Sequence, residues 1–317
     1  MPAKLDPDAA AVYRAFQDAG RPAYETLSAD EARAYYLAAR LVSNPAPREL
    51  ASVQSIAIPG PAGDIPARLY TPNKLRQDEG LAPALVFFHG GGWVVGDLGE
   101  CDSVCRFLTK HAGVTVLSVD YRLAPEHVFP AAVEDAVAWW KALLDDGIRP
   151  EDTVFAGDSA GGGLALACLI ASRDHGLPMP AGAILFSPWT DLSCSGETMQ
   201  TQAKADVMFN PDSLPEAASF YLDGQPATTP LASPLFGDLH GLPPLMIHAS
   251  RHEILLADST RLHDKARQQG VVSELHLRDK LPHVWPTMIM LPEARASLKD
   301  CGHFAARVTG STPVSAS

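Results

Sequence analysis

Short runs of apolar residues alternate with longer segments of helical periodicity along most of the chain after residue 50. The run Ala84–Phe88 is apolar at every position, as in a central parallel strand that is buried on both faces. Alternating apolar and polar residues predict two strands at 53–58 and 65–69. Further strands are predicted at 114–119, 154–156, 183–186, 245–248 and 272–277. Spacing and boundary residues predict helices at 103–111, 130–147, 164–170, 256–269 and beyond Pro286. Strands that alternate with helices indicate an α/β fold with a mostly parallel central sheet flanked by helices.

Two segments, residues 1–45 and 188–240, do not follow this rhythm. The first reads as two helices, one over residues 6–20 and one that opens with the capping box Ser28-x-x-Glu31. The second is irregular and carries apolar residues among turn residues. We expect the two segments to pack together as a helical cap over the carboxyl ends of the strands. The expected organisation is cap 1–45, core 46–187, cap insertion 188–240, core 241–309 and disordered tail 310–317.

One serine stands at the apex of a predicted strand–turn–helix. An apolar strand runs into Gly157-x-Ser159-x-Gly161, and an apolar helix follows at once. Small residues at 157 and 161 allow the strand and the helix to pack closely, while the turn strains the serine backbone. The hydroxyl then stands clear of the sheet, and the N–H groups that open the helix point at whatever it attacks. Ser159 is therefore a candidate nucleophile, and a glycine-rich turn without chemistry is the alternative.

A serine nucleophile needs a base, and the base must be held by an acid. In the α/β-hydrolase order both follow the serine on loops after late strands. Glu253 follows the penultimate predicted strand and His283 follows the last, so we predict an acid and a base at these positions. Asp258 and Asp279 are alternative acids, but the first lies inside a predicted helix and the second follows the last strand. Other histidines that compete as the base are His248, His252 and His276.

The glycine run His89-Gly90-Gly91-Gly92 stands at the end of a central predicted strand. Negative charge on a carbonyl oxygen under attack needs preorganised donors, and residues without side chains leave their N–H groups accessible. Gly91, Gly92 and Ala160 are the candidate donors of such an oxyanion hole. A flexible loop or a phosphate cradle is a weaker interpretation, because neither G-x-G-x-x-G nor G-x-x-x-x-G-K-[ST] occurs.

Composition narrows the possible functions. The chain has 317 residues and a formal net charge of −12, and no Lys/Arg cluster offsets that charge, which argues against nucleic-acid binding. The five cysteines are scattered, which favours reduced structural thiols over a disulfide framework. No metal site is predicted, because His252-Glu253 lacks the second histidine of H-E-x-x-H. With no signal-peptide pattern and no apolar run of membrane-spanning length, a cytoplasmic location is expected.

Three motifs lie in order along the chain: His89-Gly90-Gly91-Gly92-Trp93, Asp120-Tyr121-Arg122-Leu123-Ala124-Pro125-Glu126 and Gly157-Asp158-Ser159-Ala160-Gly161-Gly162. They resemble signatures of the hormone-sensitive-lipase-like carboxylesterases, bacterial family IV, and the third resembles its G-D-S-A-G subgroup. The resemblance spans about residues 50–290 and implies an α/β-hydrolase fold with a helical cap. It also implies hydrolysis of short- to medium-chain acyl esters without a cofactor.

By motif position, the resemblance implies Ser159 as the nucleophile and His283 as the base. It likewise implies that Gly91, Gly92 and Ala160 form the oxyanion hole. The acid of that family is usually Asp, in a D-P-L-R-D-E-like stretch, whereas Glu253-Ile254-Leu255-Leu256 stands here. Some relatives resemble this sequence in using Glu.

The acyl pocket is expected to include apolar residues near the site, although core packing explains each of them equally well: Trp93, Met208, Phe209, Leu214 and Val284. One rival function is a non-enzymatic small-molecule receptor, against which a complete triad argues. Another is hydrolysis of amides, which a triad alone does not separate from hydrolysis of a small-molecule ester. The final strand leaves an edge through which a homodimer is plausible.

Overall fold

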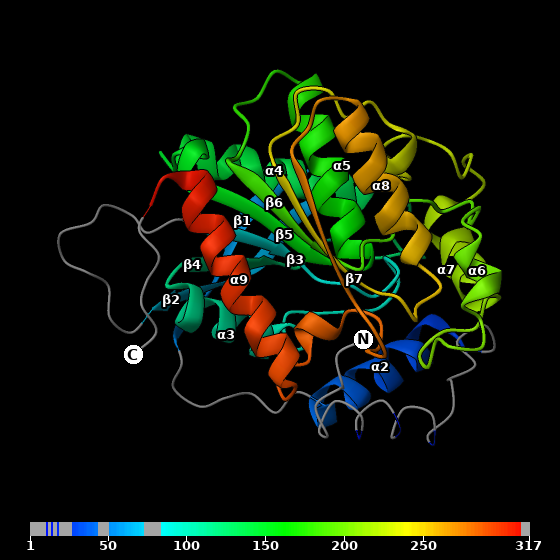
Figure 1. Cartoon of the computed structure of the whole chain (residues 1–317). Coiled ribbons are helices and arrows are strands. Elements are labelled where there is room, and N and C mark those ends of the chain that lie inside the picture. The colour runs from blue at the N-terminus through cyan, green and yellow to red at the C-terminus, as the bar shows by residue number, and fades with distance from the viewer. Residues whose placement is uncertain are drawn as a thin grey trace.

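An eight-stranded sheet organises the protein (Figure 1). The computed structural model describes residues 27–43, 51–72 and 84–311, together with Ala11, Arg14 and Asp18. The strands are β1 (Ala51–Gly60), β2 (Gly63–Pro72), β3 (Ala84–Phe88), β4 (Thr115–Val119), β5 (Thr153–Asp158), β6 (Gly182–Phe186), β7 (Leu245–Ser250) and β8 (Ser273–Arg278). Their order in the sheet is β1-β2-β4-β3-β5-β6-β7-β8. β2 pairs antiparallel with β1 and β4, and the remaining neighbours pair in parallel, which confirms the mostly parallel sheet.

The helices of the alternating region lie close to where the apolar spacing predicts them. The α-helices are α2 (Ala29–Ser43), α3 (Asp102–Ala112), α4 (Ala131–Asp145), α5 (Ala160–Asp174), α6 (Thr198–Thr201), α7 (Ser213–Leu222), α8 (Leu256–Gln268) and α9 (Pro292–Thr309). Short 3-10 turns are η2 (Pro150–Asp152), η3 (Pro234–Phe236) and η4 (Trp285–Thr287). The helix predicted at residues 6–20 falls almost wholly outside the described residues.

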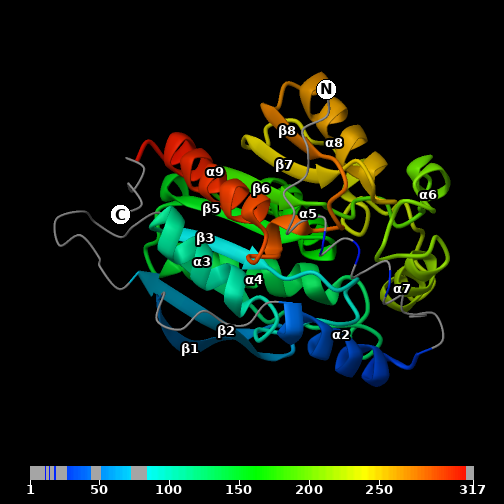
Figure 2. The same cartoon turned by 60° about the horizontal axis from the view of Figure 1, so that its bottom comes forward.

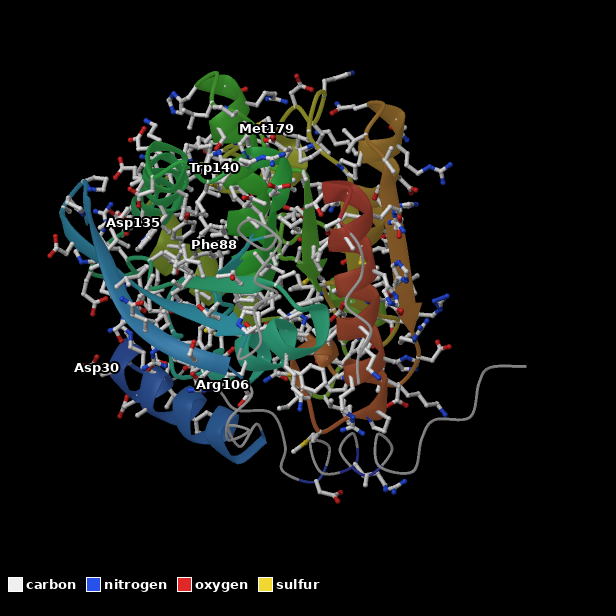
Figure 3. The ribbon with its side chains drawn as sticks, turned by 90° about the vertical axis from the view of Figure 1, so that its left-hand side faces the viewer. Asp30, Phe88, Arg106, Asp135, Trp140 and Met179 are labelled. Atoms are coloured by element: carbon white, nitrogen blue, oxygen red, sulfur yellow. The ribbon has the colours of Figure 1, made fainter. Side chains whose placement is uncertain are left out.

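Each face of the sheet has its own apolar core, which explains why β3 is apolar at every position. In β3, Leu85 and Phe87 pack with α3 and α9, whereas Val86 and Phe88 pack with α4 and α5 on the opposite face. Figure 2 shows α3 and α9 on one side of the sheet and α8 beyond β7 and β8. Phe88 and Trp140 lie in the interior in Figure 3, and Phe155 meets both of their rings edge-on.

The described helices of the two segments outside the alternation lie at one end of the sheet, whereas the carbonyls of Asp238 and His240 accept from Arg173 at the carboxyl end of α5. In Figure 2, α2, α6 and α7 stand at the end toward which the arrows of β3 and β7 point. The predicted capping box opens α2, because the Ser28 N–H donates to Glu31 Oε2 at 2.9 Å and the Glu31 N–H donates to Ser28 Oγ at 3.4 Å. The irregular stretch 188–240 contains the helices α6 and α7, which the sequence pattern does not single out.

β8 forms one outer edge of the sheet, so the edge on which a homodimer was expected is present. The dimer itself stays a prediction. At the carboxyl end, Gly310 caps α9 with a left-handed φ of 70°, and residues 312–317 lie outside the described part of the chain. Among the described helices, we find none whose length and apolar character would let it cross a membrane.

Candidate active site

The turn between β5 and α5 places Ser159 in a backbone conformation that residues other than glycine seldom adopt. Its φ is 53° and its ψ is −121°, one residue after the strand and one before the helix. Its N–H donates to the Phe186 carbonyl at 2.8 Å, and its carbonyl accepts from the Trp189 N–H at 3.0 Å. The neighbouring strand end therefore holds both sides of the strained residue. This is the geometry expected of a nucleophile elbow, with backbone strain held by surrounding hydrogen bonds.

Small residues make this turn possible for a steric reason. A Cβ on Gly157 would clash with the carbonyl of Gly161, and a Cβ on Gly161 would clash with the carbonyl of Phe88. The helix can therefore start directly against the strand and against the end of β3. The expectation of close packing at 157 and 161 is confirmed.

Ser159, His283 and Glu253 lie in hydrogen-bonding contact. His283 Nε2 is 2.9 Å from Ser159 Oγ, and His283 Nδ1 is 2.8 Å from Glu253 Oε2. A carboxylate can only accept, so Nδ1 carries the proton and Nε2 is free to accept from the serine hydroxyl. All three side chains are buried, with Glu253 at 0% and His283 at 2% exposure.

The sheet brings the two loops together. β7 and β8 are parallel neighbours, with Ser250 paired to Arg278, so both chains leave the sheet at the same edge. Ser250 donates its N–H to Glu253 Oε1 at 3.1 Å and its hydroxyl to the Leu281 carbonyl at 2.5 Å. Ser250 thus joins the loop that carries Glu253 to the loop that carries His283.

The alternative acids occupy other positions. Asp258, in α8, accepts hydrogen bonds from the Thr190 and Asp191 N–H groups at 2.7 and 2.8 Å. Burial raises the pKa of Asp258 to about 7, and the nearby charge of Asp191 acts in the same direction. Asp279 forms an ion pair with Arg251 at 3.6 Å. Within the part of the chain that the structure describes, neither carboxylate is hydrogen-bonded to His283.

The competing histidines are engaged elsewhere. His248 is buried in β7 and stacks on His276 with ring centroids 4.7 Å apart. Burial lowers the pKa of His248 to about 3, so it stays neutral. His252 Nδ1 accepts from the Lys280 N–H at 3.0 Å. Among the candidate bases, only His283 is hydrogen-bonded to Ser159 within the described residues.

The glycine loop after β3 lies against the elbow. The Gly90 N–H donates to Asp158 Oδ1 at 3.0 Å, which links the loop to the residue before Ser159. Gly91 has a φ of 119°, and a Cβ there would clash with the carbonyl of Val95. Within the described part of the chain, the N–H groups of Gly91, Gly92 and Ala160 donate to no backbone carbonyl outside regular elements. These donors are thus available at the positions where an oxyanion hole is expected.

Sequence reasoning missed the side chains that hold this loop. Tyr121 donates its hydroxyl to the His89 carbonyl at 2.6 Å. Arg33 in α2 donates to the carbonyls of Val94 and Ala124 at 2.9 and 3.0 Å. Tyr121 and Asp158 both belong to the quoted motifs, and this membership could have pointed to their role in the loop. Nothing in the sequence around Arg33 indicates its contacts, because they form only when α2 packs beside the loop.

Arg33 also forms a two-pronged ion pair with Glu126, at 2.8 and 2.6 Å. These hydrogen bonds lower the pKa of Glu126 to about 2. The pair fastens α2 beside the glycine loop, since the same guanidinium contacts the Val94 carbonyl.

Of the five apolar residues expected in a pocket, Phe209 has a ring contact with His283. The Phe209 ring meets the His283 ring edge-on, with centroids 5.0 Å apart. Met208 is half-buried beside the cluster that includes Trp285. The other three are buried, at 1% exposure for Trp93, 4% for Leu214 and 2% for Val284.

Trp93 connects the glycine loop to α7. Its ring stacks on Tyr221 with centroids 4.6 Å apart and an angle of 8° between the planes. A Cβ on Gly92 would lie 3.3 Å from the Ala217 Cβ, so α7 packs directly on the loop.

The described residues contain no group of three or more His, Cys, Asp or Glu side chains suited to a metal ion.

The sheet order and the placement of Ser159 in the turn between β5 and α5 are those of the α/β hydrolases. A family model described as alpha/beta hydrolase fold matches residues 85–287. An esterase structure from the bacterial hormone-sensitive lipase (HSL) family has a TM-score of 0.88 at 34% identity, covering 97% of this chain and 100% of that one. The chain belongs to the hormone-sensitive-lipase-like carboxylesterases of the α/β-hydrolase superfamily. Its place in the G-D-S-A-G subgroup stays a prediction.

Named relatives agree with this assignment. An acetyl-hydrolase from Streptomyces hygroscopicus is 40% identical over 236 residues, which cover 74% of this chain and 78% of the relative. A crystal structure of EstE5 soaked with p-nitrophenyl butyrate has a TM-score of 0.86 at 36% identity, covering 96% of this chain and 100% of that one. The protein is therefore a carboxylic ester hydrolase. The relatives do not support the alternative hypothesis of a non-enzymatic small-molecule receptor.

Proposed function

We propose that the protein hydrolyses short- to medium-chain acyl esters through an acyl-enzyme formed on Ser159. The observation that carries the proposal is the chain of two hydrogen bonds from Ser159 Oγ through His283 to Glu253, at 2.9 and 2.8 Å. In this proposal Glu253 is the acid.

In the first half-reaction, Ser159 Oγ attacks the ester carbonyl carbon while its proton moves to His283 Nε2. The tetrahedral intermediate then collapses, the C–O bond to the alcohol breaks, and His283 returns the proton to the leaving alkoxide. In the second half-reaction, water gives a proton to His283 and attacks the acyl carbon. The carboxylic acid leaves as Ser159 recovers its hydrogen. Glu253 keeps the proton on Nδ1 and stabilises the charged imidazolium.

We assign the oxyanion hole to the N–H groups of Gly91, Gly92 and Ala160. Support comes from the loop geometry, because Gly90 is fastened to Asp158 and Gly91 adopts a conformation that glycine favours. Preorganised donors of this kind are worth on the order of 10²–10³-fold in rate each. The charge on the carbonyl oxygen is therefore met by groups that need no rearrangement.

We propose that residues 1–45 and 188–240 form a cap that shapes the acyl pocket over the site. The edge-on contact between Phe209 and His283 supports this, since it brings the insertion to the base itself. Met208 and Phe209 are the pocket residues we favour, together with the buried residues Trp93, Leu214 and Val284. A pocket closed by such bulky side chains suits acetyl to butyryl groups, in keeping with the acetyl-hydrolase and the EstE5 soak among the relatives.

The proposal is tested with p-nitrophenyl esters from acetate to palmitate. We expect kcat/KM to peak at short acyl chains and to fall steadily beyond medium length, because each added methylene must enter the closed pocket. A p-nitroanilide of the best acyl group serves as the matched amide and should react far more slowly. A maximum at palmitate would contradict the proposed short-chain pocket. A folded protein that is inactive on every ester would contradict the proposed esterase function.

A further inference from the structure

One buried carboxylate outside the proposed triad contacts both the loop of the acid and the segment that reaches the base. Asp206 follows α6 and is 1% exposed. Its Oδ2 accepts from the Ile254 N–H at 2.9 Å, and its Oδ1 accepts from the N–H groups of Met208 and Phe209 at 2.7 and 3.0 Å. Within the described residues it takes part in no salt bridge, so backbone donors alone satisfy its charge.

The first of these bonds acts on the acid. Ile254 directly follows Glu253, so its N–H belongs to the peptide group attached to the Glu253 backbone. Holding that peptide plane restricts the direction in which the Glu253 side chain leaves the loop. Ile254 is itself buried at 1% exposure, and without Asp206 its N–H would lose its acceptor.

The other two bonds act on the segment beside the base. Asp206 closes a tight turn with the N–H groups two and three residues ahead, as Asp side chains commonly do. That turn places the Phe209 ring edge-on against His283. A single carboxylate therefore sets the acid loop and the aromatic contact of the base relative to each other.

A neighbouring contact shows that the insertion docks on this loop at more than one point. Thr198 Oγ1 donates to the Ile254 carbonyl at 2.7 Å and accepts from the Ala257 N–H at 2.8 Å. Thr198 contacts the Ile254 carbonyl, which belongs to the peptide group after Ile254. Asp206 contacts the Ile254 N–H, which belongs to the peptide group shared with Glu253. The Thr198 contact therefore docks the insertion on the loop, and the Asp206 contact is the one that bears on the alignment of the acid.

We propose that Asp206 is a positioning residue for ester hydrolysis, which aligns Glu253 through the Ile254 N–H. This inference rests on the proposed triad. Asp206 does not touch substrate and acts only through the acid.

The test is a double-mutant cycle between Asp206→Asn and Glu253→Gln, measured with p-nitrophenyl butyrate. Asparagine has one acceptor oxygen, so its amide nitrogen must face N–H donors on one side. We expect Asp206→Asn alone to lower kcat on the order of 10- to 100-fold, the scale of a small misplacement of a catalytic group, with KM nearly unchanged. In the Glu253→Gln background the same change should lower kcat less than about twofold further, because the acid it aligns is gone.

Asp102→Asn is the matched control. Asp102 is also buried and accepts from Tyr70 and Arg106, at 3.0 and 2.7 Å, on the face covered by α3 and α9. It should lower the melting temperature while leaving kcat and KM within about twofold of the wild type.

Each outcome has a separate meaning. An equal loss of kcat from Asp206→Asn in both backgrounds would reduce Asp206 to a structural role and overturn this inference. A Glu253→Gln variant as active as the wild type would instead overturn the proposed acid. If Asp206→Asn does not fold, the same cycle is run with Asp206→Ser, whose hydroxyl can still accept from the turn but not from Ile254.

Discussion

Replacing Ser159 with alanine should remove essentially all turnover of p-nitrophenyl butyrate, lowering kcat by at least about 10⁵-fold, as loss of a serine nucleophile does in other triads. The physical reason is that no other oxygen stands at hydrogen-bond distance from His283 Nε2 among the described residues. Substrate binding should persist, because the hydroxyl is a small part of the pocket surface. The measurement is steady-state kinetics on protein whose melting temperature has been checked.

A buried serine of the same helix provides the control. Ser172 lies near the end of α5, is buried and has no contact with the triad. Ser172→Ala should keep kcat within about twofold of the wild type, as expected for a substitution away from the reacting groups. Retention of more than a hundredth of the wild-type kcat in folded Ser159→Ala would show that the nucleophile lies elsewhere.

Glu253→Gln should lower kcat about 10³- to 10⁴-fold, the scale seen when the acid of a triad becomes an amide. A glutamine can donate to His283 Nδ1, which places the imidazole proton on Nε2. Nε2 then no longer accepts the proton of Ser159. KM should change little, because Glu253 is wholly buried and lies behind the imidazole.

The competing carboxylates give the comparison for this result. Asp258→Asn and Asp279→Asn should each keep kcat within a few-fold of the wild type, since neither side chain is hydrogen-bonded to His283. Kinetics of the three variants under the same conditions decide the acid. If the large loss appeared with Asp258→Asn and not with Glu253→Gln, the assignment to Glu253 would be wrong.

Much of the core could be predicted from the chain because its signals are local. Burial on both faces makes β3 apolar at successive positions, and its alternate side chains do enter two different cores. The small residues at 157 and 161 are required by clashes between close segments. Loop placement after parallel strands was enough to bring Glu253 and His283 to one edge.

The parts that escaped prediction depend on contacts distant in sequence. Helices α6 and α7 are short, and their packing partners lie on the glycine loop and on the loop of the acid. Asp206 gives a local turn signal through Met208 and Phe209, but its bond to Ile254 spans 48 positions and has no pattern in the sequence. The contacts of Arg33 likewise form only when α2 lies beside Val94, which the sequence does not indicate.

The most direct test of the central claim is to trap the nucleophile with diethyl p-nitrophenyl phosphate. Attack by Ser159 Oγ on phosphorus would release p-nitrophenolate and leave a diethylphosphoryl ester that water removes slowly. We predict release of one equivalent per chain, parallel loss of esterase activity, and a modified peptide in which Ser159 carries the group. Complete inhibition with the label on another residue, or undiminished activity with Ser159 fully labelled, would contradict the account.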